Sequence, residues 1–149
     1  MPVITTCVTL ENINACDVWP TLIDFARYPH LMDDVVEVTV SDIASHSMVS
    51  AWNVLLNGSE FTWTERDHLH PPFRIEFEQI DGDLETWQGE WTLADNGDDV
   101  IATLTIEFDI GIPSLADILN PIGERAIRAN SLQMLQAIKK NSVAVAQER

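Results

Sequence analysis

The most constraining feature of this sequence is the segment from Trp87 to Leu93, which places two tryptophans on one face of a single strand. Side chains alternate across a strand, so Trp87, Gly89 and Trp91 point to the same side. A glycine between two large rings marks a place where another backbone or a ligand comes close. The segment therefore predicts either a thick core beneath a helix or the wall of a cavity for an apolar molecule.

The composition fits one globular domain over residues 1–149. The hydrophobic content of 46% is enough for a sizeable core. The formal net charge is −16, and all but one of the acidic residues precede Arg125. Because so acidic a surface repels phosphate backbones and anionic lipid headgroups, we expect neither nucleic acid nor a membrane surface as a partner.

Patterns for membrane insertion, secretion and metal binding are missing from the sequence. It has no apolar run of membrane-spanning length and no basic-then-apolar leader. Cys7 and Cys16 are too few for a disulfide framework, and His68 and His70 lack further ligands at metal-site spacing. We therefore expect a cytoplasmic protein with reduced thiols that uses no metal and no cofactor.

Strand-like runs and turn signals alternate along most of the chain. A β-branched run over residues 3–10 precedes a helix that Asn14 can cap, and a short helical or turn segment at 31–34 follows the break at Tyr28-Pro29-His30. Hairpin-type turns separate the later strands, which favours an antiparallel meander. Those six predicted strands cover residues 35–43, 48–56, 61–65, 73–80, 85–93 and 100–110.

The last segment has helical spacing. Residues 122–146 contain no proline, and Ile127, Met134, Leu135 and Ile138 recur on one face. The whole order predicts an α+β fold in which a curved, seven-stranded antiparallel sheet grips a long C-terminal helix. Two short helices follow the first strand, and a space is left between the concave face and the long helix.

Three stretches resemble the SRPBCC (START-like, helix-grip) superfamily, most closely its polyketide cyclase/dehydrase and coenzyme-Q-binding branch. They are Asp17-Val18-Trp19 through Pro29, Gly82 through Gly89-Glu90-Trp91, and Met134-Leu135 through Ile138-Lys139-Lys140. The resemblance implies a deep, mostly apolar pocket between sheet and helix for lipids, sterols, quinones or polyketide chains. Some members of the branch close and dehydrate aromatic rings, whereas others only bind and carry.

Aromatic side chains on the predicted strands are the first candidates for the pocket wall. Stacked rings add about 0.5–1.5 kcal/mol per pair beyond area burial, which suits a flat or ring-forming ligand. Any single one of them fits an ordinary core better, and the resemblance is what favours a cavity for the set. With two residues of the last helix, the candidate substrate-binding residues are Trp52, Phe61, Trp63, Phe77, Trp87, Trp91, Phe108, Asn130 and Met134.

The candidate catalytic groups lie where the strand that contains Trp63 ends. Strict alternation puts Glu65 and Asp67 on the face of the rings and Arg66 on the opposite face. The resemblance implies an inward arginine that polarises a polyketide carbonyl, a part that Arg66 could take if a β-bulge shifts the alternation. Otherwise a buried carboxylate is the inward group and serves as a general base. A surface role for all three is the remaining reading.

Other positions bear on the same pocket. The resemblance implies a pocket tyrosine where this chain has Val35, which weakens a direct transfer of mechanism. Tyr28 lies at the pocket mouth or packs at a helix end. Asn130 and Ser131 fall within or beside the apolar stripe of the last helix, where they bind a ligand oxygen or hold a water or a neighbouring strand.

The sequence predicts a polyketide cyclase or aromatase that folds and cyclises a poly-keto intermediate, with or without dehydration. The alternative is a non-catalytic carrier of a lipid, quinone or other hydrophobic metabolite. The expected partner is a hydrophobic small molecule, free or bound to an acidic carrier protein. Arg125 and Arg128 could form a small basic docking spot for that carrier, or a solvated helix face. The oligomeric state stays open, a homodimer included.

Overall fold

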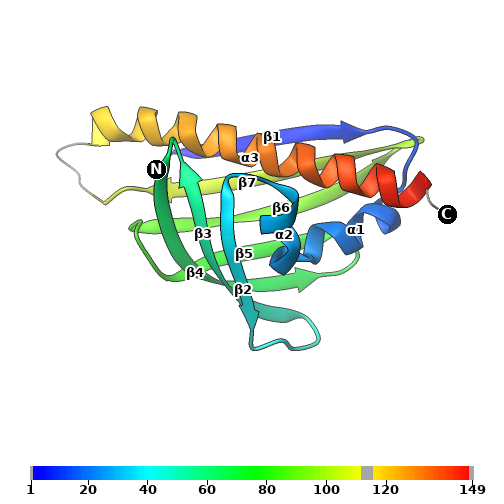
Figure 1. Ribbon diagram of the computed structural model, residues 1–149, viewed down its shortest axis with the longest axis horizontal. Coiled ribbons are helices and arrows are strands. Elements are labelled where there is room, and N and C mark those ends of the chain that lie inside the picture. The colour runs from blue at the N-terminus through cyan, green and yellow to red at the C-terminus, as the bar shows by residue number, and fades with distance from the viewer. Residues whose placement is uncertain (1, 112–115, 148–149) are drawn as a thin grey trace.

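Seven antiparallel strands form one curved sheet in the computed structural model, which describes residues 2–111 and 116–147 (Figure 1). Their order is β1-β7-β6-β5-β4-β3-β2, so that strands β2 to β7 form a meander and β1 joins it beside β7. This confirms the predicted sheet. The bounds are β1 (Val3–Leu10), β2 (Val35–Ser41), β3 (Ser47–Leu56), β4 (Ser59–His70), β5 (Arg74–Gly82), β6 (Thr86–Asn96) and β7 (Asp99–Asp109).

Short helices connect β1 to β2, as predicted. Helix α1 (Ala15–Ile23) begins after Asn14, whose side-chain oxygen accepts a hydrogen bond from the Asp17 N–H at 3.1 Å. A 3-10 turn, η1 (Phe25–Arg27), leads directly into α2 (Tyr28–Leu31). The predicted helical or turn segment at 31–34 contains the end of α2 and a turn at Asp33 and Asp34, and the helix itself begins three residues earlier. Pro29 does not break the helix, because a proline is tolerated in the first helical turn.

The long helix α3 (Ala116–Gln147) starts earlier than the predicted 122–146 segment. The sequence placed its start after Pro121 because a proline inside a helix removes a backbone donor. In the structure the helix runs through Pro121 in its second turn. Pro121 therefore removes one intrahelical hydrogen bond, and the helix continues past it.

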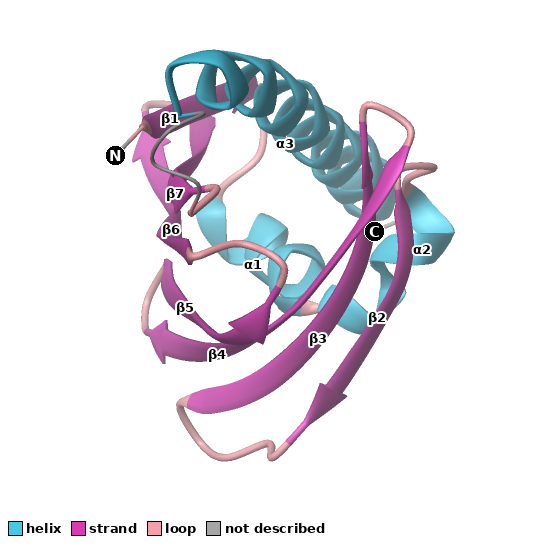
Figure 2. Cartoon of the chain, turned by 90° about the vertical axis from the view of Figure 1, so that its left-hand side faces the viewer, coloured by secondary structure: helices cyan, strands magenta, loops and turns pink. Residues whose placement is uncertain are grey.

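The sheet curls around one side of the molecule, and α3 closes the opposite side, with α1 and α2 at one end (Figure 2). Alternate residues of each strand face this enclosed interior; along β7 they run from Val100 through Leu104 to Phe108. From α3, Leu135 and Ile138 are fully buried against them. The core thus occupies the region where the sequence predicted a space.

Gly89 shows why β6 needs a residue without a side chain at that position. A Cβ atom there would lie 1.9 Å from the Thr105 carbonyl oxygen and 2.9 Å from Cζ of Phe77. The close neighbour predicted from the Trp87–Trp91 segment is therefore the β7 backbone together with a ring from β5. Gly89 lies opposite Phe77 in the β5–β6 pairing, and its lack of a side chain leaves room for that ring.

Candidate active site

Strand β4 carries the site, and its alternation is unbroken. The pairing of β3 with β4 is continuous from Ser47–His68 to Leu56–Ser59. The only register shift beside β4 falls on β5, which has an extra residue at Ile80. Glu65 and Asp67 therefore point inward and are 2% and 0% exposed, whereas Arg66 is exposed on the outer face.

This arrangement corrects one of the sequence readings. The shift of phase that would turn Arg66 into the interior does not occur, and the strand is longer than the predicted 61–65, reaching His70. An outward guanidinium cannot reach a ligand between sheet and helix. The structure brings together the two carboxyl groups instead.

Glu65 and Asp67 are held by a short chain of hydrogen bonds. The Trp63 indole N–H donates to Oε1 of Glu65 at 2.6 Å. The Ser50 hydroxyl donates to Oδ2 of Asp67 at 2.5 Å and accepts from the Trp52 indole N–H at 2.8 Å. Each carboxyl thus receives a donor, and each donor comes from β3 or β4, which are rigid elements of the sheet.

Burial controls the protonation of this pair. Desolvation raises the pKa of Glu65 well above its ordinary value, and the hydrogen bond with Asp67 and that group's negative charge raise it further. Desolvation also raises the pKa of Asp67, while its hydrogen bonds with Glu65 and Ser50 oppose the increase. Oδ1 of Asp67 has no hydrogen-bond partner among the described residues. Burial thus favours a protonated carboxyl group in this pair.

Aromatic rings surround the carboxyl pair. Trp52 and Trp63 lie opposite each other on β3 and β4 and stack with centroids 5.7 Å apart and planes at 4°. Trp63 in turn lies 4.7 Å from Trp87. On the other side, Phe25 meets Trp52 edge to face at 5.1 Å. Three of the rings predicted to line a pocket, Trp52, Trp63 and Trp87, thus contact one another and fill part of the predicted space.

Two spaces remain. An inner void of about 20 Å³ lies at the Glu65 side chain, and the other residues around it are Trp52, Trp63, Phe77, Trp87, Trp91, Leu104, Ile106 and Met134. A larger apolar cavity, which we call the vestibule, has a volume of about 270 Å³ and lies between the β3–β4 hairpin, the end of β7 and the start of α3. Its lining includes Phe61, Phe108, Gly123, Ala126 and Ile127.

Eight of the nine predicted substrate-binding residues line one of these two spaces. Phe61 and Phe108 belong to the vestibule, and the five other aromatic residues and Met134 belong to the void. Asn130 does not line either; it borders a separate groove beside Leu55, and its side-chain amide donates to the Leu55 carbonyl at 3.5 Å. Of the alternatives for Asn130, the structure favours holding a neighbouring strand.

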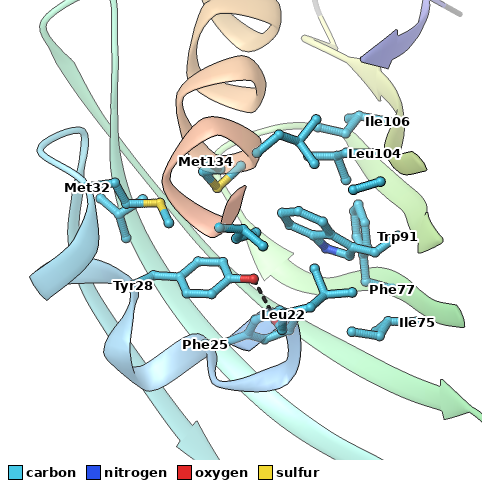
Figure 3. Close-up of a cluster of buried hydrophobic side chains, with 14 of the residues drawn as sticks. Leu22, Phe25, Tyr28, Met32, Ile75, Phe77, Trp91, Leu104, Ile106 and Met134 are labelled. Atoms are coloured by element: carbon cyan, nitrogen blue, oxygen red, sulfur yellow. Dashed lines mark hydrogen bonds between the residues drawn. The ribbon is translucent and has the colours of Figure 1, made fainter. Parts of the chain in front are cut away.

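Tyr28 has a structural place in the core. The side chain is fully buried, and its hydroxyl donates to the Leu22 carbonyl at 2.5 Å, as Figure 3 shows. Desolvation by burial, followed by the charges of Asp24 and Asp67, raises the pKa of this phenol well above its ordinary value. Tyr28 therefore stays neutral and packs at the end of α1. Val35, where a pocket tyrosine was implied, is a buried apolar residue of β2.

The two arginines of α3 do not form one basic spot. Arg128 pairs with Glu124 at 3.2 Å and reaches the Thr5 carbonyl of β1 at 3.4 Å. Arg125 instead lines the groove beside Leu55 of β3. The two side chains thus lie toward different strands, Arg128 toward β1 and Arg125 toward β3. A docking spot made of both is not present.

His68 and His70 lie on the outer face of β4, where they meet Glu78 at 3.8 Å and Glu76 at 2.8 Å on β5. Both pairs are about half exposed. Among the residues that the structure describes, no three His, Cys, Asp or Glu side chains gather in a way that could hold a metal ion. Within the same residues, no helix is both long and apolar enough to span a membrane.

Ser50 is the functional-site residue that the sequence reading missed. It lies in the inward phase of β3 between Met48 and Trp52, where a small polar residue interrupts an apolar alternation. Such an interruption signals a buried hydroxyl that needs a partner. Its partner, Asp67, is 17 residues away and becomes visible only when β3 and β4 are paired in register.

A family model for "polyketide cyclase / dehydrase and lipid transport" matches residues 12–135, which is most of the chain. The chain belongs to this family. The matched region contains β2 to β7, both carboxyl groups of the site and the part of α3 that covers them. The resemblance drawn from the sequence is therefore confirmed. A comparison with curated protein sequences found no match.

Solved structures support the helix-grip fold. A protein of Thermus thermophilus, TTHA0849, is similar with a TM-score of 0.88 and 17% identity over 97% of this chain and 99% of that one. The Zhui aromatase/cyclase from Streptomyces sp. R1128 has a TM-score of 0.84 and 21% identity, covering 95% and 93%. A START superfamily protein from Mycobacterium smegmatis has a TM-score of 0.78 and 11% identity, covering 96% and 98%.

Proposed function

We propose that this family member is a cofactor-independent cyclase of the aromatase type, which enolises and cyclises a poly-β-keto compound. The observation that carries the proposal is the buried pair of Glu65 and Asp67, with Glu65 on the wall of the inner void. A carrier of apolar molecules has no need of two carboxyl groups in its core, where their desolvation is costly. A proton-transfer catalyst needs an acid whose pKa lies nearer to neutrality.

The pair can move protons without any net change in the protein. Protonated Glu65 gives its proton to a ketone oxygen of the ligand, and the resulting carboxylate takes a proton from the carbon next to that carbonyl. The product is the enol, and Glu65 is protonated again. Trp63 donates to Oε1 of Glu65 and fixes that side chain, and the negative charge of Asp67 favours the protonated form of Glu65.

Ring closure follows from the enol. Its nucleophilic carbon bonds to a second carbonyl carbon, and the enol hydroxyl proton passes to the new alkoxide, so that a β-hydroxy ketone with the same atoms results. Loss of one water molecule, made from that hydroxyl and an adjacent C–H, gives the conjugated ring. Flat aromatic walls favour the planar intermediates over extended chains, which supplies the orientation that such a reaction requires.

The vestibule supports the same function. It is apolar, it lies next to the void through the neighbouring residues Phe108 and Trp87, and it is large enough for one or two fused rings. The void itself holds no more than one small group. We infer that the body of the ligand occupies the vestibule, while one oxygen reaches Glu65 once the rings between the two spaces move apart.

The second candidate is a non-catalytic carrier of a hydrophobic metabolite. The observation in its favour is the separation of the two spaces, because a ligand confined to the vestibule would not touch the carboxyl groups. The family description itself includes lipid transport beside cyclases. The two candidates differ in whether Glu65 changes the chemistry of a bound ketone.

Deuterium exchange of a 1,3-diketone distinguishes them. The protein is incubated with 1-phenylbutane-1,3-dione in D₂O, and loss of the proton signal between the two carbonyl groups is followed by NMR. We expect faster exchange than in buffer, a loss of roughly a hundredfold or more in Glu65→Gln, and a reduced rate in Asp67→Asn. Arg66→Ala on the outer face is the matched control and should exchange as fast as the wild type. Equal rates in the wild type and Glu65→Gln, with the diketone bound by both, would establish a carrier.

A further inference from the structure

The indole N–H of Trp87 is a buried donor without an acceptor among the described residues. Trp87 is 6% exposed, and its Nε1 atom has no contact with solvent. The indole N–H groups of the two other tryptophans at the site do have acceptors, because Trp52 donates to Ser50 and Trp63 donates to Glu65. An unpaired buried N–H costs about 1–3 kcal/mol, so an orphaned donor in a core calls for an explanation.

The explanation lies in what the Trp87 ring borders. It lines the inner void together with Glu65, and the rest of the lining consists of aromatic and aliphatic side chains and Met134. The hydrophobic members contribute no hydrogen-bonding atom, and the Trp63 N–H is already used by Glu65. The polar chemistry of the void therefore comes from the Glu65 carboxyl and the Trp87 indole.

The size and polarity of the void select the atom that fits it. About 20 Å³ holds one oxygen-sized group and little more. Trp87 can only donate, and a protonated Glu65 carboxyl presents an O–H. A group that meets two donors must accept twice, which a carbonyl oxygen does with its two lone pairs. A hydroxyl fits less well because its own hydrogen would have no acceptor.

We propose that Trp87 donates its indole N–H to the carbonyl oxygen of a bound aryl or polycyclic ketone, the same oxygen that Glu65 protonates. This inference rests on the proposed cyclase function and specifies how the ketone is held. As the oxygen gains negative charge during enolisation, the fixed N–H stabilises it in a site that excludes water. Trp87 thus positions the ketone and stabilises the negative charge that builds on its oxygen while Glu65 transfers the proton.

Two ligands of nearly the same shape test the donor directly. They are 2-acetylnaphthalene, which carries a ketone, and 2-ethylnaphthalene, which does not. We expect the wild type to bind the ketone up to about tenfold more tightly, the gain of one net hydrogen bond. Trp87→Phe keeps an aromatic ring but removes the N–H, so the preference should disappear. Phe77→Leu, which alters the same wall without a polar atom, should weaken both ligands and keep the preference.

A measurement on the unaltered protein guards against misfolding of the variant. In a ¹⁵N–¹H spectrum, one of the five indole N–H resonances should move downfield with the ketone and stay in place with 2-ethylnaphthalene. The missing resonance in Trp87→Phe assigns it. Absence of ketone preference in the wild type, or its survival in Trp87→Phe, would overturn the inference.

The outcome also separates this inference from the proposed function. A ketone preference that depends on Trp87, together with diketone exchange that does not depend on Glu65, supports the Trp87 donor and rejects the cyclase. If exchange depends on Glu65 while the preference survives in Trp87→Phe, the cyclase is retained and the Trp87 role is rejected. When both hold, exchange in Trp87→Phe should fall by roughly a hundredfold, as for the loss of one donor to a developing oxyanion.

Discussion

Trp63 donates its indole N–H to Oε1 of Glu65, which lies two residues further along the same face of β4, at 2.6 Å. The neighbouring strand β3 has the same kind of hydrogen bond, because Trp52 donates to Ser50, two residues away. Ser50 in turn donates to Asp67. The two indoles stack, and Ser50 lies directly opposite Glu65 in the β3–β4 register. The carboxyl pair is therefore positioned by two adjacent strands, and its geometry does not depend on a loop.

The stability of the protein should fall as the pH rises past the ordinary pKa of a glutamate. Burial raises the pKa of Glu65 in the folded state, so the folded protein retains a proton that the unfolded chain has lost. Stability from this site is complete below the unfolded pKa and is lost as pH rises through the folded pKa, by about 1.4 kcal/mol per pKa unit. Glu65→Gln keeps a donor for Asp67 and an acceptor for Trp63, and should flatten the dependence. Urea unfolding between pH 4 and pH 8 measures how the free energy of unfolding changes with pH, and the exposed Glu60→Gln variant is the control. If the wild type and Glu65→Gln show the same change with pH, Glu65 does not have the raised pKa of a buried acid.

Replacement of Gly89 by alanine should destabilise the protein strongly. The added Cβ would lie 1.9 Å from the Thr105 carbonyl oxygen, which belongs to the backbone and cannot move alone. We expect a loss of about 3 kcal/mol or more in the free energy of unfolding, the upper range for overpacking. Gly58→Asn is the control, because that glycine has open space around it and asparagine tolerates its positive φ of 81°. Similar unfolding midpoints for the two variants would show that β6 does not need the close approach.

Tyr28→Phe should reduce stability and leave diketone exchange unchanged. The phenol makes one buried hydrogen bond, to the Leu22 carbonyl, and its ring contacts stay in place when the hydroxyl is removed. The expected loss is about 1 kcal/mol, the usual net contribution of such a bond. Chemical denaturation and the NMR exchange rate measure the two effects. A fall in exchange comparable to that of Glu65→Gln would instead place Tyr28 in the reaction.

Ala126→Phe should block the vestibule. Ala126 lies on its α3 side, and a benzyl group would occupy much of the 270 Å³. We expect binding of 2-acetylnaphthalene to weaken by about tenfold or more, which corresponds to at least about 1.4 kcal/mol. Leu132→Phe on the exposed face of the same helix is the matched control and should bind normally. Unchanged binding in Ala126→Phe would mean that the ligand does not enter between α3 and the β3–β4 hairpin.

The sequence alone determined the fold and the phase of the site. Alternation in the strands, the Asn14 cap and helical spacing from Ile127 to Ile138 are local signals, and each was read correctly because local periodicity reports which side chains share a face. The same periodicity placed Glu65 and Asp67 inside. The predicted helix boundaries were wrong at Pro29 and Pro121, because a proline near the start of a helix is compatible with that helix, and its effect depends on its position within the turn.

Only the tertiary structure decided how much space the rings leave, and which polar atoms meet in it. The volume between Trp52, Trp87 and Met134 depends on how closely three distant segments pack, which no spacing along the chain encodes. The partnership of Ser50 with Asp67 depends on strand register, and the lone N–H of Trp87 emerges only when every nearby acceptor is accounted for. Periodicity assigns a face to a side chain, whereas hydrogen bonding and cavity volume depend on distances that arise only when the sheet closes around α3.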